Sequence, residues 1–254
     1  MAGRERRRRH HRPDGGPLYR LISLVVIFVC VGAALTLFFR VKVIEITGLH
    51  RYSAEEVQAA AEVSDGDNMF LLNKYAMAGR IAKKLPYVEE IRINRNLPDT
   101  LTIEVRECQY PLSIVQDGNA WLISSTGRIV DRVDEEAAEG IPKITGCSLL
   151  LPSVGTQLAL ATEFVREQNS LTALLTAARE AGMLPEVDGV RMEETCILLD
   201  YAGRFTIKLL YGADYAYKLH ALNLYLQEGK IQENMTGTFD LTQDVRNFFQ
   251  QDVR

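Results

Sequence analysis

The sequence has little of the material from which most catalytic and metal-binding sites are built. It holds 4 histidines, 4 cysteines and 1 tryptophan in 254 residues. His10 and His11 lie in a basic N-terminal arm, while His50 and His220 stand alone, without ligand partners at a metal-binding spacing. The motifs GxSxG, GxxxxGK and HExxH and the dinucleotide-binding fingerprint are all missing. We therefore expect a protein that is not an enzyme and has no catalytic residues, metal or cofactor.

The sequence also lacks closely spaced cysteine pairs, and the residues after the first 20 have no excess of basic side chains. Cys30 lies within a long apolar run, which leaves Cys108, Cys147 and Cys196 as an odd set with no CxxC pair. A disulfide framework is not expected, although one bridge between two of these cysteines stays open. Seven of the 29 basic and two of the 33 acidic side chains lie in the first 20 residues, which leaves 22 against 31 and a net charge of −9 beyond them. This acidic balance excludes nucleic acid as a partner of the outer region.

What the sequence does have is one long apolar run. It extends from Leu21 to Phe39 as LISLVVIFVCVGAALTLFF, 19 residues without a formal charge. At ~1.5 Å of rise per residue, a helix of this length covers ~28 Å, close to the hydrocarbon thickness of a bilayer. The run therefore predicts a single transmembrane helix. A cleaved signal peptide, with Gly32 to Ala34 near the cleavage site, is the alternative that stays open.

The arm before this run is strongly basic and predicts the orientation of the span. Positive residues flanking a span stay on the cytoplasmic side, and they also attract the anionic lipid of the inner leaflet. We therefore expect residues 1–20 in the cytoplasm and all later parts across the cell membrane. The arginines expected to set this topology are Arg6, Arg7, Arg8 and Arg9.

The segment directly after the span predicts a small α+β module. Residues 41–47 alternate as VKVIEIT, which is typical of a strand, and Ser53 with Glu56 three positions later forms a capping box. Two further alternating strands follow a second helix that Pro86 terminates. A three-stranded sheet with both helices on one face buries these apolar stripes. In chain order, the strand, two helices and two strands are expected at 41–47, 53–61, 73–85, 91–94 and 101–106.

This module resembles the POTRA domain of the bacterial cell division proteins called FtsQ or DivIB. The string LPYVEEIRINRNLPDTLTIEVRE from Leu85 follows GDNMFLL and lies behind a single span. The matching features are the glycine and asparagine before Phe70 and Leu71, the proline before the first hairpin strand, the NLPDTL turn, and a last strand that ends in Arg106 and Glu107. Together they cover roughly 70 residues in the family's order.

Residues 110–232 predict a second, larger module of hairpins and single helices. A hairpin is expected around the turn SSTG, and helical spacing of apolar residues runs from Thr162 to Ala181. A strand pair is expected at 196–199 and 205–210, followed by a helix that Asp214 caps. The closing string YGADYAYKLHAL is similar to the second domain of the same family. The resemblance implies a mixed α/β domain with a curved, mostly antiparallel sheet.

The C-terminal segment 233–254 predicts an edge strand and a tail. In TGTFDLT, Phe239 and Leu241 alternate with polar residues, and we expect this strand at the sheet edge. The tail QDVRNFFQQDVR predicts a final strand along that edge, a short helix or a frayed end. The family's usual arginine after the leucine is Thr242 here. The resemblance implies docking of FtsB/DivIC-type and FtsL-type partners by strand addition. The partner-binding residues expected are Thr238, Phe239, Asp240, Leu241, Thr242, Phe248 and Phe249.

The expected organisation has five parts: 1–20 a cytoplasmic arm, 21–39 the span, 41–109 a POTRA domain, 110–232 a second domain, and 233–254 the edge strand and tail. The resemblance implies a non-catalytic scaffold at the division septum that recruits FtsB/DivIC-type and FtsL-type proteins and links them to septal peptidoglycan synthesis. One alternative is a membrane-tethered cell-wall enzyme whose site forms from distant residues. Another is a POTRA-type chaperone, although such proteins carry a membrane barrel for which the strands here are too few.

Overall fold

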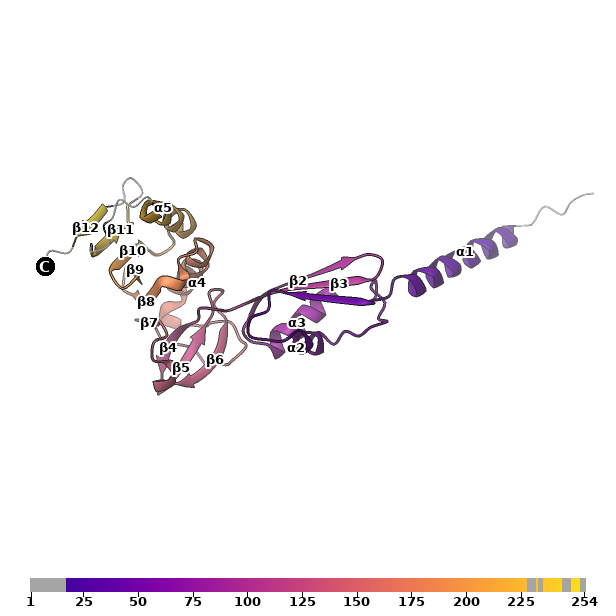
Figure 1. Ribbon diagram of the computed structural model, residues 1–254, viewed down its shortest axis with the longest axis horizontal. Coiled ribbons are helices and arrows are strands. Elements are labelled where there is room, and N and C mark those ends of the chain that lie inside the picture. The colour runs from indigo at the N-terminus through magenta and orange to yellow at the C-terminus, as the bar shows by residue number, and fades with distance from the viewer. Residues whose placement is uncertain (1–16, 228–231, 233–234, 244–247, 252–254) are drawn as a thin grey trace, which may run out of the picture. The chain divides into compact units, whose positions relative to one another are not determined.

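The computed structural model describes residues 17–227, 232, 235–243 and 248–251 (Figure 1). The contacts within the chain separate it into two compact units. The first unit consists of Met1–Glu45, Val63–Leu72 and Asn94–Thr102, and the second unit of Ile46–Glu62, Asn73–Ile93 and Ile103–Arg254. The arginines expected to set the topology, Arg6, Arg7, Arg8 and Arg9, lie outside the described residues.

The first unit contains the apolar helix that the composition predicts. Helix α1 (Pro17–Phe38) has 22 residues, which corresponds to ~33 Å of helix. The stretch Tyr19–Phe38 has a mean hydropathy of 2.8 and no part of it is buried inside the protein. By length and composition, α1 is a candidate membrane span, and it ends one residue before the expected boundary at Phe39.

The small α+β module has the element order that the sequence predicts. Helices α2 and α3 lie on one face of a three-stranded sheet of order β1-β3-β2 (Figure 1). This confirms the strand, helix, helix, strand, strand arrangement. The elements are β1 (Val43–Thr47), α2 (Ala54–Ala61), α3 (Lys74–Lys84), β2 (Val88–Asn96) and β3 (Thr100–Glu107).

Local chemistry explains where the helix α2 begins. The Ser53 hydroxyl oxygen accepts a hydrogen bond from the Glu56 N–H at 3.2 Å, and the Glu56 carboxylate accepts one from the Ser53 N–H at 2.8 Å. This is the predicted capping box, which satisfies two backbone donors that the first turn leaves free. Val57, Ile81 and Ile103 then lie fully buried between the helices and the sheet. Because burial removes these side chains from water, each stabilises the module by about 2 kcal/mol.

The remainder of the second unit is built on a nine-stranded sheet. Its order is β12-β11-β10-β9-β8-β7-β4-β5-β6, with five antiparallel and three parallel pairings. The sheet is mostly antiparallel, as expected. Its strands are β4 (Leu112–Gln116), β5 (Asn119–Ile123), β6 (Ile129–Asp134), β7 (Lys143–Thr145), β8 (Val187–Met192), β9 (Cys196–Tyr201), β10 (Phe205–Leu210), β11 (Gly237–Asp240) and β12 (Phe248–Gln251).

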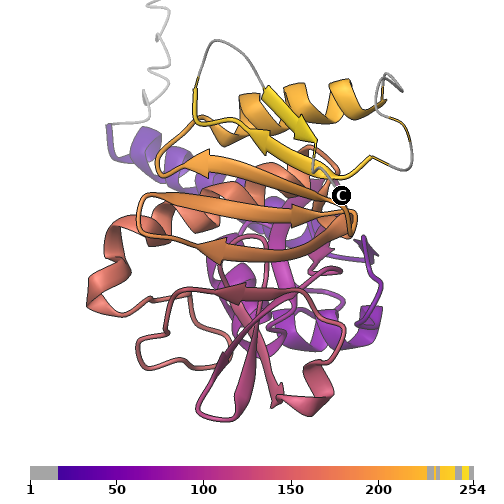
Figure 2. The ribbon, with the colours of Figure 1, turned by 90° about the vertical axis from the view of Figure 1, so that its left-hand side faces the viewer.

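Two long helices pack on one face of this sheet. Helix α4 (Val165–Glu180) and helix α5 (Tyr215–Gln227) lie beside each other along its C-terminal strands (Figure 2). Leu174 of α4, Leu219 of α5 and Leu199 of β9 are fully buried in the same apolar core. Three short 3-10 helices complete the fold: η1 (Glu136–Ala138), η2 (Thr162–Phe164) and η3 (Leu184–Glu186).

The position of strand β11 in the sheet differs from the expectation. β11 pairs in parallel with β10 on one side and antiparallel with β12 on the other, so it is not the edge. The alternation in TGTFDLT indicates which side chains of the strand face the core and which face solvent: Phe239 is buried and Thr238 is partly exposed. An alternating pattern carries no information about whether a neighbouring strand is present. Of the three possibilities for the tail, the final strand is the one found.

Candidate partner-binding site

The C-terminal end of the large sheet is the candidate site. β12 is the last strand in the sheet order, and its register places Phe249 opposite Phe239 and Gln250 opposite Thr238. Among the described residues, no strand pairs with the other side of β12. An edge of this kind presents backbone N–H and C=O groups to an incoming strand. The arrangement is suited to binding an extended segment of another chain.

An aromatic cluster holds β11 and β12 to the rest of the sheet. Phe239 is 1% exposed, and its ring lies 5.2 Å from that of Phe205 and 4.9 Å from that of Phe249, measured between centroids. Tyr225 of helix α5 approaches the same ring at 6.5 Å. Such aromatic pairs contribute about 1 kcal/mol each beyond their buried area. The last two strands are therefore fixed by side-chain packing as well as by their backbone pairing.

Glycine at position 237 permits the close approach of β12. A Cβ atom built on Gly237 would lie 2.2 Å from the carbonyl oxygen of Gln250 and 2.8 Å from the ring of Phe249. Neither distance is compatible with a side chain, because the first neighbour is backbone and the second belongs to the packed cluster. The glycine thus decides how tightly the last strand sits on β11.

A buried lysine supports the chain where it leaves β11. Lys218 comes from helix α5, and its ammonium group donates hydrogen bonds to the carbonyl oxygens of Leu241 at 2.8 Å and Gln243 at 3.4 Å. Both Lys218 and Leu241 are buried. A buried ammonium needs such acceptors, since desolvation otherwise penalises its charge. Helix α5 therefore fixes the path of the chain between the last two strands.

A short side-chain turn ends β11. The Asp240 carboxylate accepts hydrogen bonds from the Thr242 hydroxyl at 2.6 Å and from the Thr242 N–H at 3.0 Å. The bond from the hydroxyl is the largest cause of the lowered pKa of Asp240, and the positive charge of Lys208 acts in the same direction. Thr242, the position at which the sequence departs from the family's usual arginine, thus has a local structural role.

The predicted partner-binding residues fall into two groups. Phe239 and Leu241 are buried and hold the strand in place, so their side chains do not face an incoming chain. Thr238, Asp240, Thr242 and Phe249 are partly exposed. Phe248 belongs to β12, and its side chain lies outside the described residues.

The prediction from sequence did not include two residues that shape the site, Gly237 and Lys218. A lysine within the apolar stripe of helix α5, one residue before Leu219, is the signal in the sequence that could have revealed the buried amine. Gly237 has no such signal, because the clash that excludes a side chain there involves residues 249 and 250.

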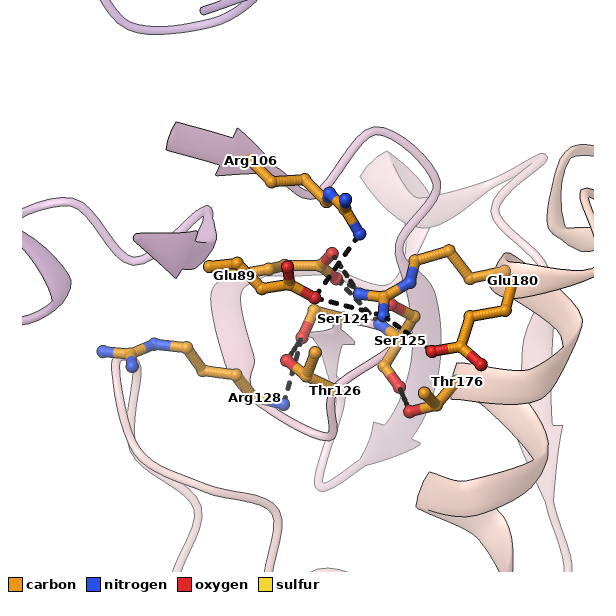
Figure 3. A network of polar contacts seen from close by, with 10 residues as sticks. Glu89, Arg106, Ser124, Ser125, Thr126, Arg128, Thr176 and Glu180 are labelled. Carbon is orange, nitrogen blue, oxygen red and sulfur yellow. Dashed lines mark hydrogen bonds and ion pairs between the residues drawn. The ribbon is translucent and has the colours of Figure 1, made fainter. Parts of the chain in front are cut away.

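A second polar cluster of the second unit surrounds Glu89 of β2 (Figure 3). Its carboxylate accepts hydrogen bonds from the N–H and the hydroxyl of Ser125, both at 3.0 Å, and pairs with Arg179 of helix α4 at 3.4 Å. The Glu89 side chain is 3% exposed and that of Arg179 is 17% exposed. Thr176, one turn before Arg179, donates to the Ser125 carbonyl at 3.0 Å. The cluster joins a strand of the small module to a turn and a helix of the large one.

Burial also governs the thiol next to this cluster. Desolvation raises the pKa of Cys108 to about 12, and the neighbouring Glu89 carboxylate adds to the rise. A thiol with such a pKa is protonated at neutral pH and is a poor nucleophile. Within the described part of the chain, no group of three or more His, Cys, Asp and Glu side chains is placed to hold a metal ion.

Comparisons with known proteins point in one direction. Residues 39–107 match the family model described as "POTRA domain, FtsQ-type". The cell division protein FtsQ of Geotalea daltonii is 30% identical over 113 residues, which are 44% of this chain and 40% of that protein. The FtsQ of Corynebacterium glutamicum is 24% identical over 170 residues, 61% of this chain and 76% of that protein. The DivIB of Clostridium botulinum is 25% identical over 150 residues, 57% of this chain and 58% of that protein. The chain thus spans about two fifths of the first of these relatives and just over half of the DivIB.

An apolar N-terminal helix that is a candidate membrane span, a β-α-α-β-β module and a large mixed sheet define a protein of the POTRA class. The match to the Corynebacterium glutamicum protein covers 61% of this chain, about 155 residues, so it must extend beyond residue 107, where the POTRA match ends. Residues 39–107 are thus a POTRA domain of the FtsQ type, and the chain is similar to the bacterial cell division proteins FtsQ and DivIB.

Proposed function

We propose that this protein is a non-catalytic scaffold of the bacterial division machinery. In this proposal α1 holds the protein in the cell membrane at the septum, with residues 1–20 in the cytoplasm and the two modules outside. The large sheet binds FtsB/DivIC-type and FtsL-type single-span proteins, which connect it to septal peptidoglycan synthesis. The similarity to the FtsQ and DivIB proteins supports the division role, and the edge strand β12 supports the mode of binding.

The observation that carries the proposal is the position of β12 in the sheet. It is the last strand in the order, and it pairs on one side with β11. Phe239 of β11 and Leu241 directly after it are buried in the core. Within the described residues, β12 is paired on one side and unpaired on the other. Such a strand can form backbone hydrogen bonds with one more strand. Backbone hydrogen bonds would supply much of the affinity, and alternate side chains of β12 would supply the specificity.

The partly exposed side chains on the same strands fit this role. Thr238, Asp240 and Thr242 lie on the wet face of β11 and the turn after it, and Phe249 lies partly exposed on β12. We assign the partner contacts to these residues, to Phe248 and to the backbone of 248–251. Phe239 and Leu241 act indirectly, because they position β11.

A pair of substitutions at one exposed position tests strand addition. Gln250→Pro removes a backbone N–H from β12, whereas Gln250→Ala keeps that N–H and removes only an exposed side chain. The N–H faces either β11 or the incoming strand, so its loss weakens binding in both cases. We expect the proline variant to bind the purified FtsB/DivIC-type and FtsL-type pair at least about tenfold more weakly, which corresponds to about 1.4 kcal/mol.

The measurement is co-purification of the full-length chain with the partner pair in detergent, followed by titration of the same samples. Circular dichroism of each variant checks that the fold is kept. Equal binding by wild type, Gln250→Ala and Gln250→Pro would rule out strand addition at β12. If the intact protein binds neither partner, the scaffold function itself is wrong. Release of peptides from purified peptidoglycan by the protein alone would favour a cell-wall enzyme instead.

A further inference from the structure

The loop Asn68–Leu72 of the first unit is attached to the outer end of helix α1. The side-chain amide of Asn68 donates hydrogen bonds to the carbonyl oxygens of Thr36 at 3.3 Å and Leu35 at 3.5 Å, both in the last turn of the helix. The last carbonyls of a helix lack partners within the helix itself. Asn68 therefore caps α1 from a segment more than thirty residues away in the sequence.

The same asparagine shapes the loop that carries it. Its side-chain oxygen accepts hydrogen bonds from the N–H groups of Phe70 at 2.9 Å and Leu71 at 3.3 Å. The side-chain NH2 group of Asn68 thus binds the end of helix α1, and its side-chain oxygen binds the loop. The backbone N–H groups of Phe70 and Leu71 are therefore satisfied within the loop.

Backbone hydrogen bonds hold the loop beside the residues that follow the helix. The N–H of Met69 donates to the Phe39 carbonyl at 3.0 Å, and the N–H of Val41 donates to the Asp67 carbonyl at 2.9 Å. Met69 is fully buried, so the loop is anchored from its inner side as well. The position of Phe70 relative to the end of α1 is therefore defined by several contacts within one compact unit.

Two large apolar side chains of this loop are exposed. Phe70 is 49% exposed and Leu71 is 80% exposed, although their neighbour Met69 is fully buried. The Phe70 ring packs edge-on against the ring of Phe39, with 5.1 Å between the centroids. Phe39 directly follows the last residue of α1, and Arg40 comes next. An apolar surface is thus continuous from the candidate span to the loop.

We propose that Phe70 and Leu71 insert into the outer interface of the bilayer that α1 spans. A helix of ~33 Å crosses a hydrocarbon core of ~30 Å and ends close to the headgroups. A ring in contact with Phe39 then lies at a similar depth, where aromatic and apolar side chains are favoured beside lipid headgroups. The occupant of this surface is therefore lipid, and the loop is a second, shallow membrane contact.

The chemistry of the neighbouring groups fits the headgroup region. Asn68 gives a second donor to the Leu35 carbonyl, which also accepts from the Phe39 N–H at 3.3 Å, and to the Thr36 carbonyl, so both are well satisfied at this depth. Arg40, exposed and hydrogen-bonded through Nε to the Thr36 carbonyl at 3.4 Å, presents its guanidinium beside the loop, where lipid phosphates lie. The inference depends on α1 spanning a bilayer and is independent of partner binding at β12.

A single tryptophan placed in the loop tests the contact. The chain has one tryptophan, Trp121, so Trp121→Phe gives a background in which Phe70→Trp is the only indole. Leu71→Trp in the same background is a second reporter of the loop. Tyr217→Trp on helix α5 is the matched control, because Tyr217 is 72% exposed and belongs to the second unit.

The full-length chain is reconstituted into vesicles of phosphatidylglycerol and phosphatidylcholine in which the phosphatidylcholine carries bromine atoms. Bromine near the glycerol end of the acyl chains should reduce the emission of Phe70→Trp to about half, whereas Tyr217→Trp should keep its emission. Bromine near the chain ends should quench Phe70→Trp less, because the loop lies in the interface.

Three results would overturn the proposal. The first is equal quenching of the loop reporters and Tyr217→Trp. The second is a blue-shifted emission of Phe70→Trp without quenching, which would mean that protein, such as a second copy or another span, covers the ring. The third is strongest quenching by bromine at the chain ends, which would place the ring in the bilayer centre. Partner binding measured in detergent is unaffected by any of these outcomes, so the two proposals fail separately.

Discussion

At the scale of single residues, Lys218 is a buried charged side chain with a structural role. Its ammonium group donates hydrogen bonds to the carbonyl oxygens of Leu241 and Gln243. We expect Lys218→Met to lower the free energy of unfolding by about 2 kcal/mol, because the buried Leu241 carbonyl loses a charged donor while the apolar volume is kept. Urea denaturation of the full-length protein in detergent measures this change.

The control for this prediction is Lys83→Met, at an exposed position near the end of helix α3. A change within about 0.5 kcal/mol is expected there. If the two substitutions have equal effects, the hydrogen bonds from Lys218 do not stabilise the chain after β11. A selective loss at Lys218 should also speed hydrogen exchange in residues 237–241 before other strands are affected.

The turn after β11 predicts a dependence on pH. The folded pKa of Asp240 is depressed, chiefly by the hydrogen bond from the Thr242 hydroxyl. A depressed folded pKa contributes stability above the unfolded pKa of ~3.9, and this contribution is lost as the pH falls through the folded value. We expect Thr242→Val to reduce stability more at about pH 6 than at about pH 3. At the lower pH Asp240 becomes protonated in the wild type as well, so the Thr242 hydroxyl has less carboxylate to stabilise.

Thr242→Ser is the matched control, because it keeps the hydroxyl. Its unfolding free energy should follow that of the wild type across the same pH range. A difference between wild type and Thr242→Val that stays constant with pH would show that Asp240 does not titrate with this bond.

At the scale of elements, the cluster around Glu89 ties a strand, a turn and a helix together. Glu89→Gln keeps the size of the side chain and removes its charge, which leaves the largely buried Arg179 with Glu90 at 3.2 Å and the exposed Glu180 at 3.8 Å. We expect a loss of about 2 kcal/mol in unfolding free energy, because hydrogen bonds to a buried charge are strong.

Glu180→Gln provides the comparison for this element-scale prediction. Glu180 pairs with the same arginine, but its side chain is 61% exposed. The expected change is within about 0.5 kcal/mol, since solvent screens exposed ion pairs. A loss at Glu180 as large as that at Glu89 would contradict the assignment of the stabilisation to the buried carboxylate.

The elements also differ in how far the sequence predicts them. The strands and helices of the small module follow clear two-residue and helical periods, and the capping box marks where α2 begins. Residues 112–116 and 187–192 form β4 and β8 without such a period, because β4 begins with three consecutive buried residues and β8 contains Gly189. A strand that is covered on both faces has no alternation to reveal it.

At the scale of the whole molecule, the proposed function assigns to the basic arm the choice of the membrane side that the modules face. We expect replacement of Arg6, Arg7, Arg8 and Arg9 by glutamate to reverse or block the orientation, because positive residues near a span stay in the cytoplasm. Protease added to bacterial cells without their wall should digest the wild-type modules, and it should leave a large share of the variant protected.

The same four positions changed to lysine should keep the wild-type pattern, since the charge is unchanged. Identical digestion of the glutamate and lysine variants would mean that another part of the chain sets the orientation.

The sequence by itself determined the apolar helix, the element order of the small module and the resemblance to the FtsQ and DivIB proteins. These depend on composition and on short-range periods, since a bilayer requires only length and apolarity, and a capping box involves residues three positions apart. Only the tertiary structure decided that β12 and not β11 is the last strand, that Lys218 supports the chain after β11, and that Asn68 caps α1. Each of these depends on contacts between segments distant in the chain, and a local pattern contains no record of such contacts.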